Sequence, residues 1–353
     1  MLSYDVVEWG QALEKRERVT PTPQGTEVLV KLKYCGVCHS DVHIRDGYFD
    51  LGGGKRMHMS ERGMQPPVTL GHEPFGTVIA AGPDARGAIG APLGVDRLIF
   101  PWTGCGACVR CQDGSDNYCM APNMIGIQRP GGYADHLLVP HPRYLVDASG
   151  VDPVWAATLS CSGLSTYSAV SKLKPIPGDE WVAVMGAGGL GLSAIGMLRA
   201  FGHERIVSID IDAAKLPLAE SAGAAAVLNS RDTKAAQRLK QLTGGALYGA
   251  VDFVGTSETA NLALSALRKG GKLILVGLFG GEIAISIAST ILRAITVQGS
   301  HVGSVAELKE VVALARDGTI KPIPIETRRL AEVSRTLDDL KAGSVIGRVV
   351  AQV

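Results

Sequence analysis

Residues 181–191 read Trp181-Val182-Ala183-Val184-Met185-Gly186-Ala187-Gly188-Gly189-Leu190-Gly191 and decide the fold of this 353-residue chain. A short apolar run leads into the pattern G-x-G-x-x-G, a helical stretch follows to Phe201, and a second strand at 205–210 ends in Asp210. The pattern alone is weak, but this order, with an acid about twenty residues later, is typical of dinucleotide-binding units. The glycines let a pyrophosphate approach the helix N-terminus, and Asp210 can accept hydrogen bonds from ribose hydroxyls. The alternative for Asp210 is a solvated residue at a strand end.

Short strands and helical stretches continue to alternate after this fingerprint. Further strands are predicted at 225–228, 249–254, 272–276 and 294–299, which brings the number to six. Six such strands with helices between them predict a doubly wound α/β sheet. We expect NAD rather than NADP, because Asp210 would repel a 2′-phosphate and no arginine follows it directly. The predicted cofactor contacts here are Gly186, Gly188, Gly189, Leu190, Gly191 and Asp210.

Potential metal ligands are concentrated in the stretch Cys35-Gly36-Val37-Cys38-His39-Ser40-Asp41-Val42-His43, and Gly71-His72-Glu73 follows about thirty residues later. Zinc selects thiolate and imidazole ligands, and a site with few protein ligands leaves a coordination position open for a substrate oxygen. The pattern therefore indicates a catalytic metal. Taken singly, Cys38 is better explained as a small buried hydrophobe and His72 as a hydrogen-bonded core histidine, and only the later motifs favour the metal site.

Four more cysteines, Cys105, Cys108, Cys111 and Cys119, have the spacing C-x2-C-x2-C-x7-C in a polar, glycine-bearing loop. Four thiols so close together in such a loop are not explained by hydrophobic packing. Four thiolates around one ion form a closed tetrahedral zinc site that stabilises a loop too polar to build its own core. An iron–sulfur cluster is the alternative.

The remaining segments predict a β-rich first part and a tail that returns to it. Strands are expected at 28–33, 77–80, 96–100 and 132–139, a long helix at 153–174, and in the tail two helices and a strand at 347–350. Ser40 and Asp41 could cap a short helix that ends at Ile44. Residues 51–67 show no periodicity and are predicted to be a long loop, which either walls a substrate pocket or is a mobile surface insertion.

Composition and charge point to a small partner molecule. The formal net charge is +1, with acids and bases interspersed, which gives no electrostatic footprint for nucleic acid or an anionic membrane. The N-terminus has no basic and apolar leader, and no run of eighteen apolar residues occurs. We expect a cytoplasmic protein. Its seven cysteines then suggest metal binding more than disulfides.

Taken together, these motifs resemble the zinc-dependent, medium-chain alcohol dehydrogenase family over essentially the whole chain, with the strongest similarity to tetrameric NAD-dependent enzymes of bacteria and archaea. The resemblance implies a β-rich GroES-like catalytic domain plus a Rossmann cofactor domain. It places the catalytic domain at 1–160 and 298–353, a structural zinc lobe at about 101–122 and the NAD-binding domain at 161–297. The motifs that carry it include Gly36 to His43, Gly71 to Glu73, the four-cysteine lobe, 131–134, 161–163, the glycine fingerprint, 276–280 and Gly347-Arg348.

The same resemblance implies a role for individual residues. Catalytic zinc would be bound by Cys38, His72 and Cys161, with Glu73 as a neighbour or alternate ligand and Asp41 as support. Cys161 by itself is indistinguishable from a core residue. The other implied residues are His39 and Arg348 at the pyrophosphate, Lys215 at the ribose, Val276 at the cofactor, and Trp102, which is either a wall of the substrate pocket or simply buried.

The implied reaction is reversible hydride transfer between a primary or secondary alcohol, with its aldehyde or ketone, and NAD, in a protein with two zinc ions per chain. Ser40 would pass the alcohol proton towards His43, whose imidazole titrates in the useful range. Two alternatives stay open, a zinc polyol or sugar dehydrogenase of the same superfamily and an inactive NAD-binding regulatory protein. An uncovered sheet edge at 294–299 predicts a homo-oligomer, with a tetramer favoured over a dimer.

Overall fold

The computed structural model describes residues 1–87 and 90–353 and divides into two compact units. The first unit contains residues 1–48, 58–164 and 303–353, and the second contains residues 49–57 and 165–302. The first unit contains two sheets and the second is built on one large sheet, and buried apolar residues form a core in each unit.

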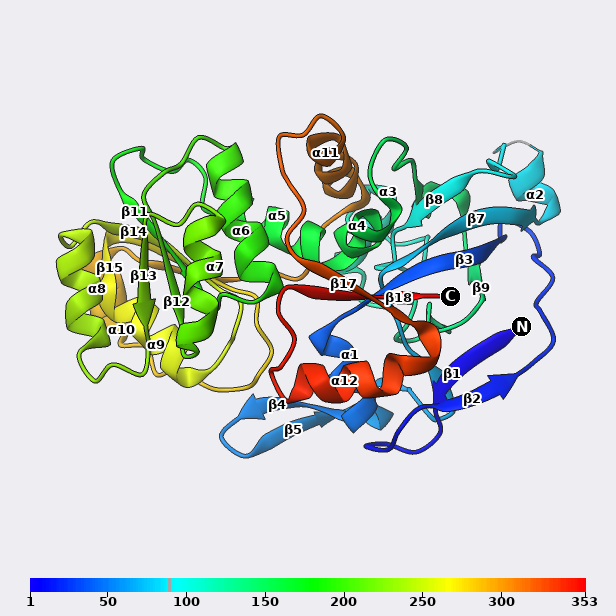
Figure 1. Cartoon of the computed structure of the whole chain (residues 1–353), viewed down its shortest axis with the longest axis horizontal. Coiled ribbons are helices and arrows are strands. Elements are labelled where there is room, and N and C mark those ends of the chain that lie inside the picture. Colours follow the sequence, from blue (N-terminus) through cyan, green and yellow to red (C-terminus); the bar gives the residue numbers. More distant parts are fainter. Residues whose placement is uncertain (88–89) are drawn as a thin grey trace. The chain divides into compact units, whose positions relative to one another are not determined.

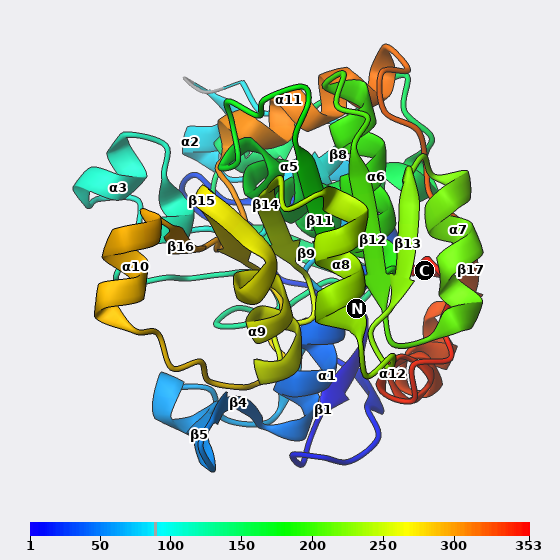
Figure 2. The same cartoon turned by 90° about the vertical axis from the view of Figure 1, so that its left-hand side faces the viewer.

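The second unit is built on a six-stranded parallel sheet (Figure 2). Its spatial order is β13-β12-β11-β14-β15-β16, so the strand of the glycine fingerprint, β11, lies in the middle and the chain winds outward in both directions. This order confirms the predicted doubly wound sheet. The strands are β11 (Trp181–Met185), β12 (Ile206–Asp210), β13 (Ala226–Asn229), β14 (Leu247–Asp252), β15 (Leu267–Leu275) and β16 (Thr296–Gly299).

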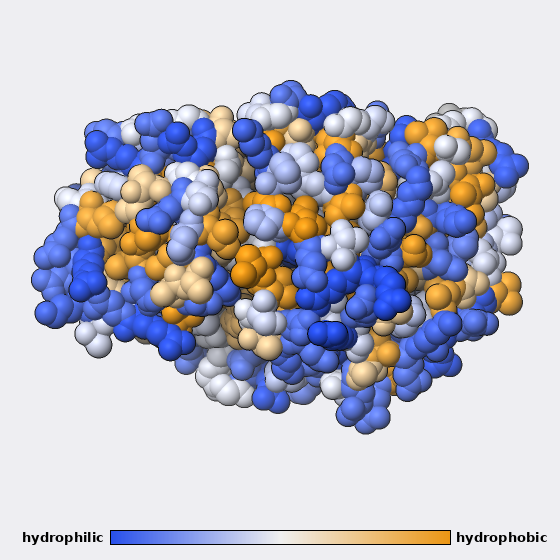
Figure 3. Space-filling model, in the orientation of Figure 1, coloured by the Kyte–Doolittle hydropathy of each residue, from blue (hydrophilic) through white to orange (hydrophobic). Residues whose placement is uncertain are grey.

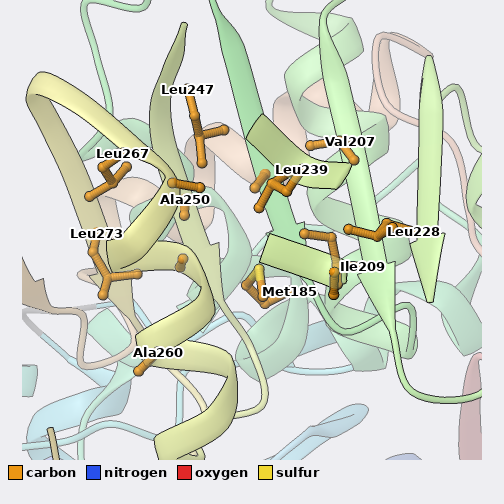
Figure 4. Close-up of a cluster of buried hydrophobic side chains, with 14 residues drawn as sticks. Met185, Val207, Ile209, Leu228, Leu239, Leu247, Ala250, Ala260, Leu267 and Leu273 are labelled. Atoms are coloured by element: carbon orange, nitrogen blue, oxygen red, sulfur yellow. The ribbon is translucent and has the colours of Figure 1, made fainter. Parts of the chain in front are cut away.

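Helices pack on this sheet through apolar side chains. In the close-up of Figure 4, Leu239 of α8 and Ala260 of α9 contribute to the same buried cluster as Met185 and Ile209 of the central strands. Strand residues buried on both faces explain why these segments form continuous apolar runs. The helices of this part are α5 (Leu164–Ser171), α6 (Gly189–Ala200), η5 (Ala213–Lys215), α7 (Leu216–Ser221), α8 (Ala235–Thr243), α9 (Ser257–Ala266) and α10 (Ile287–Arg293).

The first unit is β-rich, as predicted. One sheet has the order β10-β8-β7-β3-β18-β17 with β9 also paired to β3, and a smaller sheet has the order β2-β1-β6. The C-terminal strand β18 pairs antiparallel with β3 from the start of the chain (Figure 1). The strands are β1 (Leu2–Val6), β2 (Glu14–Glu17), β3 (Val28–Val37), β6 (Val68–Thr69), β7 (Pro74–Ala81), β8 (Asp96–Ile99), β9 (His136–Val139), β10 (Leu145–Val146), β17 (Ile325–Arg329) and β18 (Arg348–Gln352).

Helices in the first unit are mostly short, and several begin or end beside the predicted site residues. In Figure 1, α12 lies alongside α1. The helical segments are α1 (His39–Asp46), η1 (Ser60–Arg62), α2 (Pro83–Arg86), α3 (Val109–Gln112), η2 (Asp116–Tyr118), η3 (Pro142–Tyr144), α4 (Pro153–Thr158), η4 (Leu159–Gly163), α11 (Val305–Arg316), η6 (Leu330–Glu332) and α12 (Val333–Lys341).

The predicted loop at 51–67 is wrong in its first half. Residues 48–58 form a hairpin of β4 (Tyr48–Gly52) and β5 (Lys55–His58), and η1 follows. Gly52, Gly53 and Gly54 all have positive φ, which only glycine adopts readily and which closes the turn. The hairpin was missed because most of its side chains are exposed, so no apolar alternation marks it.

Two helix predictions also need correction. The N-cap of α1 is Cys38, and Asp41 accepts the backbone N–H of Cys38 from the third helical position, so Ser40 and Asp41 do not themselves begin the helix. The expected single helix at 153–174 is interrupted by a π-helical segment at Leu159–Gly163. A π-bulge of this kind frequently marks a functional site, and this one contains Cys161.

The surface mixes polar and apolar residues. On the face shown in Figure 3, hydrophilic side chains are interspersed with hydrophobic ones. Within residues 1–87 and 90–353, no helix has both the length and the apolar character needed to cross a membrane.

Candidate metal and cofactor sites

Three residues from distant parts of the sequence converge in the first unit. Cys38 lies between β3 and α1, His72 lies between β6 and β7, and Cys161 lies in the π-helical segment η4. Their ligand atoms all lie within 4.8 Å of one another, and the two sulfur atoms are 4.0 Å apart. All three side chains are buried. The structure therefore brings together the residues that the resemblance grouped.

The donor set of this cluster fits a zinc ion. Zn–S bonds of about 2.3 Å at a tetrahedral centre place two sulfurs about 3.8 Å apart, close to the spacing of Cys38 and Cys161. Asp41 Oδ1 lies 2.9 Å from His72 Nδ1 and favours a proton on that nitrogen, so Nε2 is the nitrogen that would bind a metal. Among the described residues, Nε2 is buried without a hydrogen-bond partner. A bound cation would satisfy this otherwise costly orphaned atom.

The two thiols of the cluster differ in acidity. A hydrogen bond from the Cys161 thiol holds the pKa of Cys38 well below its usual range, against the opposing effect of burial. The same interaction and burial raise the pKa of Cys161. The contact between the two thiols thus favours ionisation of Cys38 over Cys161, and the thiolate is the form that binds zinc.

Glu73, the residue after His72, forms a buried ion pair with Arg348. Its other oxygen accepts the backbone N–H of Ser162 at 3.1 Å. A Cβ at Gly36 would lie 1.8 Å from a carboxylate oxygen of Glu73, so this position requires glycine. Burial raises the pKa of Glu73 to about 7, although Arg348 opposes the shift. Glu73 is thus held against the segment that carries Cys161, and its role as an alternate ligand stays a prediction.

The residues of the predicted proton relay lie on α1. Ser40 and His43 are half-buried, and the rings of His39 and His43 are 5.2 Å apart between centroids. Burial, with the neighbouring imidazole of His39, lowers the pKa of His43. His43 is therefore neutral at physiological pH and able to accept a proton.

Trp102 is buried beside the cluster. Its indole N–H donates to the carbonyl oxygen of Ser160 at 3.0 Å, and its ring lies 5.3 Å from that of His72. The Trp102 side chain thus contacts His72 and the segment that contains Cys161, and these contacts account for its burial. Its role as a pocket wall stays a prediction.

The four cysteines at 105–119 also form one group, with ligand atoms within 4.8 Å of one another. Cys108 Sγ lies 3.6 Å from Cys111 Sγ and 3.7 Å from Cys119 Sγ, spacings that fit a closed tetrahedral zinc site. Arg143 supports the lobe by donating to the carbonyl oxygen of Cys111 at 3.0 Å and pairing with the buried Asp116. Sequence reasoning missed Arg143, because it lies outside the lobe in the sequence.

The glycine fingerprint in the second unit has the geometry of a nucleotide-binding turn. Gly186 has φ +93°, and a Cβ at Gly191 would lie 1.8 Å from the Gly186 carbonyl oxygen, so the turn is closed tightly before α6. A Cβ at Gly188 would meet nothing within 4 Å, which leaves the helix N-terminus open to an anion. Asp210, at the end of β12, accepts the backbone N–H of Ala187 at 2.6 Å. These residues fit NAD.

The other predicted cofactor residues lie in both units. Lys215 ends η5 and Val276 follows β15, both in the second unit, and Leu190 lies in the first turn of α6. His39 and Arg348 belong to the first unit. The structure therefore places three of them near the carboxyl ends of the parallel strands or on the helix after β11, where open α/β sheets bind ligands.

Comparison with known proteins gives the family. Residues 24–149 match the alcohol dehydrogenase GroES-like domain, and residues 189–317 match the zinc-binding dehydrogenase domain. The NAD-dependent alcohol dehydrogenase of Sulfurisphaera tokodaii is 34% identical over 351 residues, which cover 99% of both chains. This chain belongs to the zinc-dependent, medium-chain alcohol dehydrogenase family. The family predicted from the motifs is thereby confirmed.

Solved structures of this dehydrogenase family share the whole fold. The alcohol dehydrogenase of the archaeon Aeropyrum pernix superposes with a TM-score of 0.89 at 28% identity, and the match covers 100% of both chains. The D-arabinose dehydrogenase of Sulfolobus solfataricus superposes with a TM-score of 0.83 at 27% identity, covering 100% of this chain and 99% of the other.

Proposed function

We propose that this protein is an NAD-dependent zinc alcohol dehydrogenase that interconverts primary or secondary alcohols with aldehydes or ketones. The observation that carries the proposal is the convergence of Cys38, His72 and Cys161, with the lone pair of His72 Nε2 buried and unpartnered among the described residues. A binding protein does not need three such ligands with a fourth position left open. The four-cysteine lobe would hold a second, structural zinc.

In this proposal the residues have distinct tasks. Cys38, His72 and Cys161 would hold a zinc ion, which would supply Lewis acidity towards a substrate oxygen. Hydride acceptance belongs to NAD, held by the turn at 186–191 and by Asp210. Ser40 takes the hydroxyl proton of the alcohol and His43 receives it, because His43 is neutral at physiological pH. In the direction of carbonyl reduction the same two residues return a proton.

A sugar or polyol is the second candidate substrate. The similarity to a D-arabinose dehydrogenase favours it, since that fold match covers the whole of this chain. The regulatory alternative has less support, because a protein without chemistry would have no use for the buried ligand cluster.

Initial rates of NADH formation test the proposal directly. Purified protein is given NAD with primary, secondary and benzylic alcohols, sorbitol and D-arabinose, each with and without a zinc chelator. We expect turnover with a simple alcohol, loss of turnover on chelation, and poor use of NADP. Turnover with the sugars alone would establish the second candidate. Absence of turnover with every substrate, in protein that contains two zinc ions per chain, would reject the enzymatic proposal.

His43→Ala is expected to slow alcohol oxidation about tenfold or more near pH 7, and less as the pH rises. The parent imidazole is a base above its own pKa, which burial lowers, so it works across the neutral range. The variant depends on hydroxide, which becomes abundant only at alkaline pH. Steady-state rates between pH 6 and pH 10 measure the effect, and added imidazole should restore part of the rate. Superimposable pH profiles for parent and variant would exclude His43 from the relay.

We further propose that the protein is a cytoplasmic homo-oligomer, a tetramer rather than a dimer, with one contact formed by the edge of the parallel sheet. Strand β16 ends the sheet and pairs only with β15 among the described strands. Helix α10, drawn near this edge in Figure 2, buries none of its residues, and Ile287, Ile291 and Leu292 are 79%, 71% and 74% exposed. An open edge beside exposed apolar side chains is suited to a second copy of the chain.

Ile291→Asp is therefore expected to lower the molecular mass in solution. A carboxylate placed in an apolar contact would have to be desolvated without a partner, which opposes association. Sedimentation velocity measures the mass of the parent and the variant. Val19→Asp is the control, because Val19 is 92% exposed on the first unit and should leave the mass unchanged. An oligomeric parent whose mass the Ile291 variant preserves would show that subunits associate through another surface.

A further inference from the structure

Tyr133 is a fully buried tyrosine whose hydroxyl is directed at the support of the proposed zinc site. It belongs to the segment Gly131-Gly132-Tyr133-Ala134, ahead of β9, and is among the largest completely buried side chains in the described part of the chain. Its hydroxyl donates to Asp41 Oδ2 at 2.7 Å. Burial, together with the Asp41 carboxylate, raises the pKa of Tyr133, so the hydroxyl keeps its proton.

Asp41 is the point through which this tyrosine reaches the ligands. Its Oδ1 lies 2.9 Å from His72 Nδ1 and 3.4 Å from the backbone nitrogen of Gly71, which donates to it. Its Oδ2 accepts the backbone N–H of Cys38 at 3.1 Å and the hydroxyl of Tyr133. The Asp41 carboxylate therefore links the His72 ring to the backbone of Cys38. Tyr133 contributes one of the donors to this carboxylate, through its hydroxyl.

The backbone around His72 is shaped to receive the tyrosine ring. Gly71 has φ +94°, and a Cβ there would lie 2.6 Å from Tyr133 Cδ1. The two segments are also joined by the N–H of Tyr133, which donates to Leu70 O at 2.9 Å, and by the N–H of Gly132, which donates to Gly71 O at 2.7 Å. The ring thus packs against the residue directly before His72, so its hydroxyl is held in a fixed position.

We propose that Tyr133 is a positioning residue for the catalytic metal. Its hydroxyl fixes the Asp41 carboxylate, and Asp41 in turn fixes the His72 ring and the backbone at Cys38. The inference rests on the proposed zinc site at Cys38, His72 and Cys161. Outer partners of metal-ligating histidines typically contribute about 10–100-fold to metal affinity or activity. Tyr133 is one hydrogen bond further from the metal ligands than Asp41. We therefore expect its loss to lower metal affinity by about tenfold, the lower end of that range.

Zinc release from folded Tyr133→Phe protein tests this proposal without any reliance on turnover. Zinc-loaded protein is mixed with an excess of a chromophoric chelator, and the absorbance of the zinc complex is followed with time. Cys161→Ser protein identifies the phase that comes from the catalytic site. We expect the Tyr133→Phe variant to release catalytic zinc about tenfold faster than the parent, while zinc in the four-cysteine lobe leaves at the parent rate.

Two controls separate positioning from a general loss of stability. Tyr248 is another buried tyrosine, and its hydroxyl donates to the carbonyl oxygens of Leu173 and Pro175 in the second unit. Tyr248→Phe should therefore lower the melting temperature but leave both release phases unchanged. In Asp41→Asn protein, adding Tyr133→Phe should have little further effect, because residues that act through one group are not additive.

Each outcome has a distinct meaning. A Tyr133→Phe variant that releases catalytic zinc at the parent rate overturns the inference, as does full additivity with Asp41→Asn. A parent that holds zinc in the lobe alone rejects the proposed catalytic site itself.

If the Tyr133→Phe variant does not fold, 3-fluorotyrosine at position 133 keeps the hydroxyl and makes it a stronger donor. Release of zinc no faster than from the parent is then expected, and faster release would contradict the proposal.

Discussion

Cys161→Ser protein is expected to lose alcohol oxidation by about a thousandfold or more while it keeps the zinc of the four-cysteine lobe. Lewis-acid catalysis by a bound metal contributes several kcal/mol, and about 4 kcal/mol corresponds to a thousandfold in rate. A serine hydroxyl is a poor substitute, because zinc favours the softer thiolate and the serine proton is lost far less readily. The lobe uses a separate set of cysteines and should be unaffected.

Metal analysis combined with steady-state rates measures this effect. The parent should hold two zinc ions per chain and the variant one. Cys35→Ser is the matched control, because Cys35 is also buried in the first unit but is absent from the ligand group formed by the described residues. The control should retain both metals and its activity. A Cys161→Ser variant with full activity would remove Cys161 from the ligand set.

Asp210→Ala is expected to lower kcat/KM for NAD by about 10–100-fold and to raise the use of NADP relative to NAD. Hydrogen bonds to a charged acceptor are worth about 1.5–3 kcal/mol, which gives this range. The carboxylate also accepts the N–H of Ala187 in the glycine turn at 2.6 Å, so its loss loosens the turn as well. Removal of the negative charge abolishes the repulsion of a 2′-phosphate.

Rates with NAD and NADP, measured for parent and variant, give the change in preference. Asp212→Ala is the control two residues away. The exposed Asp212 side chain accepts the N–H of Ala214 at 3.0 Å and caps η5, so its removal deletes an equal charge from the same loop. Its cofactor preference should stay close to that of the parent. If the two variants behaved alike, the selectivity would come from the net charge of the loop rather than from Asp210.

Local sequence patterns were sufficient to predict the strands and the glycine turn of the second unit. Its central strands β11, β12 and β14 are buried along most of their length, so they are mainly apolar in the sequence, and the glycines of the fingerprint mark the turn that follows β11. The predicted positions agree with the observed strands to within a few residues.

In the first unit, strand β17 was not predicted, because most of its residues are exposed and polar and give no apolar pattern.

The four-cysteine lobe was equally accessible from sequence. Its ligands lie within fifteen residues, so spacing alone brings them together.

Cys161, in contrast, could not be identified as a metal ligand from local spacing. It is separated from Cys38 by 123 residues and lies among small apolar side chains, so only a family resemblance could single it out. The π-helical turn that carries it has no sequence signature of its own.

The parallel sheet, the nucleotide-binding turn, the four-cysteine lobe and the family could all be predicted from the sequence, because each depends on residues close together in the chain or on spacings that few families share. The folded chain was needed to show that Glu73 pairs with Arg348, that Arg143 supports the lobe, and that Tyr133 donates to Asp41. These contacts join segments that are distant in the chain. Their geometry is set by the packing of whole elements, and no local pattern of residues encodes it.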